Sequence, residues 1–139
     1  MTIAIAHNDT AEGRAALLHA AREATFQRTS LAVLHVLGDL EPVDDAALER
    51  EIGEQLSAGG FEGLDWTLHT APEDTNRAAA LVGLTEETGA ELLVVGSRRR
   101  TPIGKFLLGS TVQRVVLDSP VPVLVVKAPT DEPGDAAAR

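Results

Sequence analysis

The sequence contains no cysteine, and this absence excludes two kinds of site. Without thiols the chain has neither a disulfide framework nor a thiolate that could act as a nucleophile or metal ligand. No apolar run comes near the roughly 20 residues that a membrane-spanning helix requires. The first residues, Met1 to Ala4, also lack the basic start and cleavage pattern of a signal peptide. A cytoplasmic protein without a membrane span is therefore the expectation.

An excess of positive charge is also missing, since the formal net charge is −9 at pH 7. Nucleic-acid-binding domains are typically basic, so nucleic acid is not expected as a partner. The cations are instead concentrated locally, because Arg98, Arg99, Arg100 and Lys105 lie within eight residues of one another. Such a cluster in an acidic protein indicates a site for a local anion.

The order of apolar runs predicts alternating strands and helices. A length of 139 residues suits one domain with a core large enough for stability. The predicted strands are 3–7, 31–37, 64–70, 92–95 and 121–126, and the predicted helices follow residue 10, span 46–56 and 76–88, and begin at residue 109. Gly89 is the expected residue after the third helix. Residues 128–139 lack apolar periodicity, which predicts a disordered tail after a domain of residues 1–127.

This alternation determines the predicted fold class. Strands joined by right-handed helical crossovers form a parallel sheet with helices on both faces. The expected fold is therefore α/β, with a doubly wound five-stranded parallel sheet. Ligands of such sheets bind beyond the carboxyl ends of the strands, where the strand order reverses. The loops that follow the predicted strands 3–7 and 92–95 are expected to meet there.

The stretch 96–111 has the residues of a phosphate cradle. Gly96 and Gly109 bracket it, and glycine lets backbone N–H groups approach a ligand closely. Ser110 and Thr111 open the next predicted helix, where hydroxyl groups and the helix dipole favour an anion. The same hydroxyls also suit a simple helix cap, and arginine runs are often solvated surface. A phosphate role and a purely structural role both stay open on these residues alone.

Other polar residues give weaker signals. His7 lies at the end of a predicted strand, but no nucleophile or carboxylate pair is placed by the sequence to work with it. His35 lies within an apolar run, which favours a buried, hydrogen-bonded histidine over a catalyst. The acidic clusters at 44–45, 49–51 and 86–87 lack the spacing of metal ligands and are interpreted as solvated helix faces.

Taken together, these motifs resemble the universal stress protein family. The resemblance covers the chain except its tail and is carried by residues 3–6, 12–17, 34–36, 94–97, 107–110 and 118–126. It implies an adenine nucleotide alpha hydrolase-like fold with strand order 3-2-1-4-5. It also implies a homodimer in which the last strands of two subunits pair. The expected interface residues are Val123, Leu124, Val125 and Val126.

One branch of that family binds an adenine nucleotide at a glycine signature. The signature is a glycine, two residues, a second glycine, nine residues, and a third glycine followed by Ser or Thr. Gly96, Gly109 and Ser110 match this spacing, whereas Arg99 stands in place of the second glycine. The Arg99 side chain occupies space near the phosphate, yet a guanidinium group is itself a bidentate phosphate partner. A modified nucleotide pocket is the preferred interpretation.

The opening loop departs from the family in a second way. Asn8 stands where an aspartate is usual, and asparagine keeps a carbonyl acceptor while adding a donor for a ribose or adenine. The resemblance places the adenine beside Val36. The complete set of expected nucleotide-binding residues is Ala6, Asn8, Val36, Gly96, Arg98, Arg99, Gly109, Ser110 and Thr111.

The predicted function is a homodimeric stress-response regulator that binds ATP or AMP, with Mg²⁺ accompanying ATP. Because of Arg99 and Asn8, a nucleotide-free dimeric interaction protein of the same family is the alternative. An enzyme is not expected. Slow ATP hydrolysis would need a water-positioning group that no residue of the sequence specifically indicates.

Overall fold

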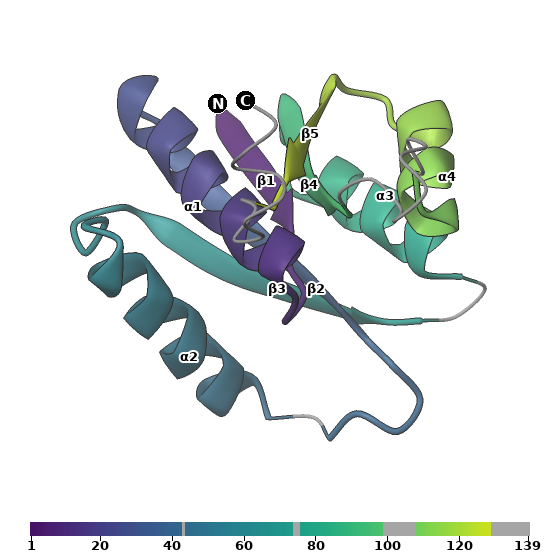
Figure 1. Ribbon diagram of the computed structural model, residues 1–139, viewed down its shortest axis with the longest axis horizontal. Coiled ribbons are helices and arrows are strands. Elements are labelled where there is room, and N and C mark those ends of the chain that lie inside the picture. The colour runs from purple at the N-terminus through teal and green to yellow at the C-terminus, as the bar shows by residue number, and fades with distance from the viewer. Residues whose placement is uncertain (43, 74–75, 99–107, 129–139) are drawn as a thin grey trace, which may run out of the picture.

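The computed structural model describes residues 1–42, 44–73, 76–98 and 108–128. Within them, strands and helices alternate along the chain (Figure 1). The elements are β1 (Thr2–Ala6), α1 (Ala11–Phe26), β2 (Ser30–Leu37), α2 (Asp45–Ala58), β3 (Trp66–Pro72), α3 (Arg77–Glu87), β4 (Leu92–Ser97), α4 (Ser110–Asp118) and β5 (Val123–Lys127). None of the helices in these ranges is long and apolar enough to cross a lipid bilayer.

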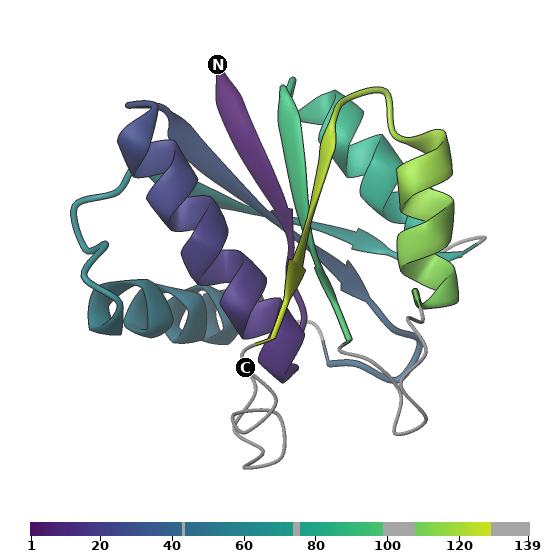
Figure 2. The same cartoon turned by 45° about the horizontal axis from the view of Figure 1, so that its top comes forward.

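The five strands form one parallel sheet in the order β3-β2-β1-β4-β5. This confirms the predicted fold class and strand order. Helices α1 and α2 cover one face of the sheet, and α3 and α4 cover the other (Figure 2). The central strand β1 pairs with β2 on one side and with β4 on the other. The strand order therefore reverses between β1 and β4, as the position of a ligand site requires.

Strand β1 shows how the sequence builds this double-sided core. Ile3 and Ile5 pack into the core beneath α1 and α2, while Ala4 and Ala6 pack into the core beneath α3 and α4. All four are buried, because a central parallel strand is covered on both faces and its side chains alternate between them. Burial on both faces is the reason that residues 3–6 form a continuous apolar run.

Helix starts differ in how their first N–H groups are satisfied. Thr10, Asp44 and Asn76 cap α1, α2 and α3, each accepting a hydrogen bond from a backbone N–H in the first turn. Helix α4 instead begins after Gly109, which provides no side-chain cap. At the other end of α3, Gly89 adopts φ +66°, the left-handed conformation predicted for the residue after a helix.

The observed bounds differ from the predicted ones in places that matter for function. Strand β4 continues through Gly96 and Ser97, so these two residues belong to the strand and not to the loop that follows it. Strand β5 begins at Val123 and not at residue 121, because Pro122 has no N–H to donate and contributes only its carbonyl to Leu93. Residues 99–107 lie outside the described residues, as does the predicted tail apart from Ala128, which is buried.

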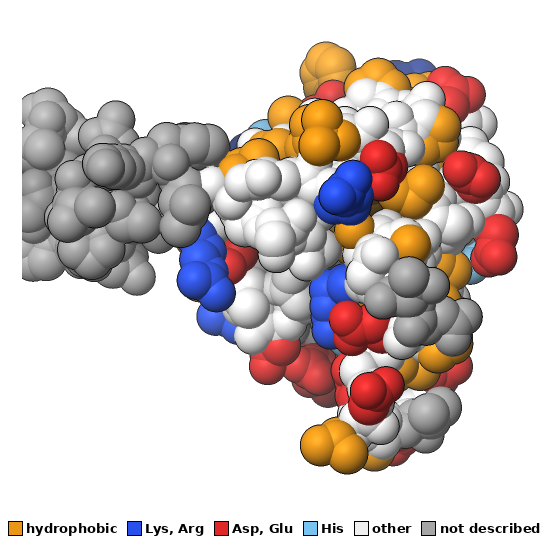
Figure 3. All heavy atoms as spheres, turned by 90° about the vertical axis from the view of Figure 1, so that its right-hand side faces the viewer, with side chains coloured by type: hydrophobic (Ala, Val, Ile, Leu, Met, Phe, Trp, Pro, Cys, Tyr) orange, Lys and Arg blue, Asp and Glu red, His pale blue; other side chains and the backbone are white. Residues whose placement is uncertain are grey.

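The edge of the sheet beside α4 carries partly exposed apolar groups. Strand β5 is the last strand of the sheet, and its valines and leucine are half-buried. On α4, Val116 and Leu117 are 43% and 75% exposed. Figure 3 looks onto the side of the molecule that carries α4, where hydrophobic side chains lie among charged ones. This side is a candidate surface for contact with another protein.

Candidate functional site

A cavity of about 480 Å³ lies at the carboxyl ends of β1 and β4, where the strand order reverses. Its volume falls within the range of roughly 300–1,000 Å³ that is usual for small-molecule sites. Eight of the nine predicted nucleotide-binding residues line it: Ala6, Asn8, Val36, Gly96, Arg98, Gly109, Ser110 and Thr111. The ninth, Arg99, lies outside the described residues. The structure thus brings together residues that are up to 105 positions apart in the sequence, from Ala6 to Thr111.

One part of the cavity wall is apolar. Val36 from β2, Leu81 from α3 and Val95 from β4 line it, and all three belong to the core beneath α3 and α4. Val112 and Val115 of α4 extend this surface. A flat aromatic base can pack against such a wall. The position of an adenine beside Val36 stays a prediction.

Another part of the wall suits an anion. Helix α4 starts here, and Gly109 precedes it with φ −60° and without a side-chain cap. Among the residues that the structure describes, no atom lies within 4 Å of a methyl group added at Gly109, so these residues leave the space beside this helix start open. Ser110, Thr111 and the exposed Arg98 line the same cavity. Backbone N–H groups, two hydroxyls, a guanidinium and the positive end of a helix dipole therefore border one space.

Asn8 is held in place by the first turn of α1. Thr10 Oγ1 donates to Asn8 Oδ1 at 2.5 Å and accepts from the backbone N–H of Gly13 at 2.9 Å. One lone pair of the Asn8 oxygen is thus engaged within the loop, which leaves the second lone pair and the amide N–H₂ for a ligand. A Cβ on Gly13 would overlap Asn8 Oδ1 and the Asn8 carbonyl oxygen. Sequence reasoning missed Gly13, although a glycine so close to a helix start was a signal.

Packing explains why residue 96 is a glycine, and the sequence did not indicate this reason. From the sequence, a glycine at this position predicts a close approach of its backbone to a phosphate. A Cβ at this position would lie 2.6 Å from the carbonyl carbon of Glu12 and 3.0 Å from the nitrogen of Gly13. Gly96 therefore permits the end of β4 to pack against the first turn of α1. It shapes the cavity by bringing these two elements together.

A chain of hydrogen-bonded side chains ends at the cavity. Glu41 Oε2 lies 2.5 Å from His35 Nε2, and His35 Nδ1 lies 3.0 Å from His7 Nδ1. Both histidines are buried, with 8% and 6% of their surface exposed, and His7 lines the cavity. As expected, His35 is a satisfied buried histidine. No pattern in the sequence indicated a carboxylate partner for His7. The structure connects His7 to the carboxylate of Glu41 through His35.

The pKa values in this chain are displaced from their ordinary values. Burial first, and His35 second, lower the pKa of His7 from 6.5 to about 4, although Asp9 and Glu41 act in the opposite direction. Burial acts to raise the pKa of Glu41, but hydrogen bonds from His35 and Gly38, with the charges of His35 and Arg77, outweigh it and lower that pKa. His7 is therefore uncharged at neutral pH and adds no cation to the cavity.

Two further charged residues line the cavity without having been predicted. Arg77, at the start of α3, donates to the carbonyl oxygen of Val36 at 3.4 Å and pairs with Glu73 at 3.6 Å. Glu12 lies in the first turn of α1. In the described part of the chain, no three His, Cys, Asp or Glu side chains are grouped to hold a metal ion. A metal ion in this cavity would need further ligands from a bound molecule.

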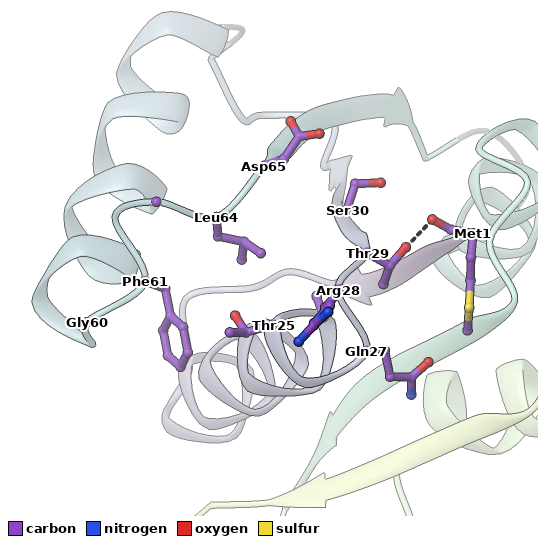
Figure 4. A pocket seen from close by; sticks show the side chains of 12 residues that line it. Met1, Thr25, Gln27, Arg28, Thr29, Ser30, Gly60, Phe61, Leu64 and Asp65 are labelled. Atoms are coloured by element: carbon purple, nitrogen blue, oxygen red, sulfur yellow. Dashed lines mark hydrogen bonds between the residues drawn. The ribbon is translucent and has the colours of Figure 1, made fainter.

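A second hollow, of about 750 Å³, lies at the opposite end of the sheet. Figure 4 shows Phe61 and Leu64 on one side of it, and Thr29 donating a hydrogen bond to the carbonyl oxygen of Met1 on the other. Its wall includes the last turn of α1, whose dipole is negative at this end and disfavours an anion. The smaller cavity, at the carboxyl ends of the strands, is therefore the candidate site.

Comparisons with known proteins agree with this geometry. The sequence model described as the universal stress protein family matches residues 1–127. A universal stress protein of Mycolicibacterium smegmatis is 35% identical over 116 residues, which cover 83% of this chain and 88% of that protein. Several other curated relatives are longer, and the chain spans about half of their length.

Solved structures show the same architecture. A universal stress protein of Archaeoglobus fulgidus is 27% identical, with a TM-score of 0.73 over 91% of this chain and 98% of that one. A universal stress protein solved in complex with cAMP is 25% identical, with a TM-score of 0.71 over 93% of this chain and 98% of that one. The family match, the strand order and the cavity at the reversal point lead to one conclusion: this chain belongs to the universal stress protein family.

Proposed function

We propose that the protein binds an adenine nucleotide, ATP or AMP, in the cavity at the carboxyl ends of β1 and β4, and that it acts as a stress-response regulator. One observation carries the proposal. The cavity joins an apolar wall at Val36 to the uncapped start of α4 at Gly109, with Arg98 beside it. A nucleotide has the matching distribution of chemistry, because its base is flat and apolar on its faces and its phosphate is anionic.

This distribution gives the nucleotide a direction in the cavity. The phosphate lies against the N–H groups at the start of α4 and against Arg98, where the helix dipole favours negative charge. The base lies against Val36 and Leu81. The ribose then occupies the middle of the cavity, within reach of the amide group of Asn8. Mg²⁺ is expected only with ATP, whose phosphate oxygens would supply most of its ligands.

The relative solved with cAMP supports the ligand class. It shares 25% of its residues with this chain and has the same fold over 93% of it. The ligand in that structure contains an adenine, a ribose and a phosphate, which are the three groups that the cavity suits. We therefore include cAMP among the ligands to be compared with ATP and AMP.

Calorimetry tests the proposal directly. Titration of the full chain with AMP, cAMP and ATP with Mg²⁺ should give saturable heat for at least one ligand. Gly109→Glu should abolish it, because a carboxylate would occupy the open space beside the start of α4. Gly63→Glu is the matched control, since it adds the same charge in open space at the opposite end of the sheet. No heat with any ligand at high micromolar protein would refute nucleotide binding and favour the nucleotide-free alternative.

The remaining parts of the proposal concern assembly and chemistry. We propose that two copies pair through β5, because an edge strand with half-buried apolar side chains invites pairing with another strand. We further propose that the protein binds its ligand without catalysing a reaction, and that it does so in the cytoplasm. A phosphate-release assay with ATP and Mg²⁺ tests whether it catalyses ATP hydrolysis. Turnover that Gly109→Glu removes would make the protein an enzyme.

A further inference from the structure

Strand β2 continues past the end of β1, and this decides where the backbone of Val36 points. The ladder between the two strands ends at Leu34, whose carbonyl oxygen accepts a hydrogen bond from the N–H of His7. Backbone groups of successive strand residues face opposite neighbours, and the carbonyl of Leu37 faces β3, where it accepts from the N–H of Glu73. The N–H and C=O of Val36 therefore face the space past the end of β1, where Val36 lines the cavity.

The guanidinium group of Arg77 lies against this carbonyl group. Arg77 is the first residue of α3, and its Nη1 donates to the Val36 carbonyl oxygen at 3.4 Å, while its Nη2 lies 3.6 Å from Glu73 Oε2. Leu81, one helical turn further along α3, lines the same cavity, so both residues lie on the helix face that borders it. The contact places a cation beside the apolar wall of Val36 and Leu81.

This position leaves Arg77 able to bind a ligand. Its side chain is 37% exposed, and 3.4 Å is longer than the about 2.9–3.0 Å of an ordinary N–H···O hydrogen bond. A guanidinium has several N–H donors and no acceptor, so it carries donors besides those directed at Val36 and Glu73. A ligand atom that reaches Arg77 therefore meets a charged group that can only donate hydrogen bonds.

Purines differ at the edge that such a group reads. Guanine and hypoxanthine have two neighbouring acceptors there, O6 and N7, whereas adenine has N7 beside an amino group that donates. The planar fork of arginine fits O6 and N7 together. The amino group of adenine can still donate to the second lone pair of the Val36 carbonyl oxygen, but it then faces the donors and the positive charge of Arg77.

We propose that Arg77 is a specificity-determining residue that donates to O6 and N7 of a 6-oxopurine, so that the cavity binds IMP and GMP at least as tightly as AMP. The inference rests on the proposed function for the position of the base, against Val36 and Leu81. It extends the ligands of the site from adenine nucleotides to 6-oxopurine nucleotides.

Calorimetry with IMP and AMP measures this preference, because the two nucleotides differ only in the base. IMP should bind the wild type at least as tightly as AMP. Arg77→Met removes the donors and should weaken IMP binding about tenfold without weakening AMP binding. Arg77→Lys keeps the charge but not the fork, and should retain part of the affinity for IMP. Arg22→Met removes an exposed arginine of α1 as the matched control and should change neither affinity.

The outcomes separate this inference from the proposed function. Weaker binding of IMP than of AMP to the wild type would overturn the role of Arg77 while leaving nucleotide binding intact, and this comparison needs no variant. An equal loss of both nucleotides in a folded Arg77→Met, checked by circular dichroism, would also overturn it, because Arg77 would then contact the phosphate or only support the site. If neither nucleotide binds the wild type, the proposed function fails and the inference fails with it.

Discussion

Replacing Gly96 by alanine is the most direct test of how the cavity is built. The added methyl group would overlap the carbonyl oxygen of Glu12, and would lie 2.6 Å from its carbonyl carbon and 3.0 Å from the nitrogen of Gly13. These are backbone atoms in the first turn of α1, so no side-chain rotation relieves the contact. Either the start of α1 or the end of β4 has to move.

The expected cost follows from this geometry. Overpacking a tight interior site costs about 1–3 kcal/mol, and a clash with backbone belongs at the upper end. We expect Gly96→Ala to lower the free energy of unfolding by about 3 kcal/mol, a large part of the roughly 5–15 kcal/mol typical of a domain. For a chain of this size, that corresponds to a decrease in Tm of about 10 °C. Nucleotide binding should weaken as well, because both displaced elements line the cavity.

Urea denaturation followed by circular dichroism measures this effect, with Gly83→Ala as the matched control. Gly83 lies inside α3, and in the described part of the chain no atom outside the helix backbone lies within 4 Å of an added methyl group. Alanine there removes the helix penalty of glycine and should raise the free energy of unfolding by about 1 kcal/mol. Replacing glycine by alanine is thus expected to lower the free energy of unfolding at residue 96 and to raise it at residue 83. A Gly96→Ala variant as stable as the wild type would refute the packing argument.

Three other predictions concern the histidine chain, the opening loop and the sheet edge. Folding lowers the pKa of His7 from 6.5 to about 4, so the unfolded chain binds this proton more tightly than the folded chain. The free energy of unfolding should therefore decrease by up to about 3 kcal/mol as the pH falls from 6.5 to 4. Urea titrations at several pH values should show this extra slope relative to His7→Gln, and parallel profiles would contradict it. Gly13→Ala should lower stability by about 2–3 kcal/mol and weaken AMP binding in calorimetry, since its methyl group overlaps Asn8; unchanged affinity would show that Asn8 is not needed. Val125→Lys on β5 should give a monomer in sedimentation, whereas Leu117→Lys on α4 should remain a dimer; a wild-type monomer at working concentration would disprove pairing through β5.

The elements of the fold could be predicted because their signals are local. The apolar run at the start of the chain is the mark of a strand buried on both faces, and Ile3 and Ala4 do pack on opposite sides of the sheet. Gly89 follows α3 in a left-handed conformation, as its position after a helical pattern indicated. Alternation of such elements restricts the topology to a doubly wound sheet, and the place of the candidate site follows from it.

The sequence by itself determined the order of strands and helices, the family, and eight of the residues that line the cavity, because periodicity, caps and glycine spacing act over a few residues. Only the tertiary structure decided that Gly96 packs against α1 and that Glu41 reaches His7 through His35. His7 and His35 are 28 residues apart, and their contact depends on the register of β1 with β2. Such contacts are set by how elements pack in space, which no local pattern records.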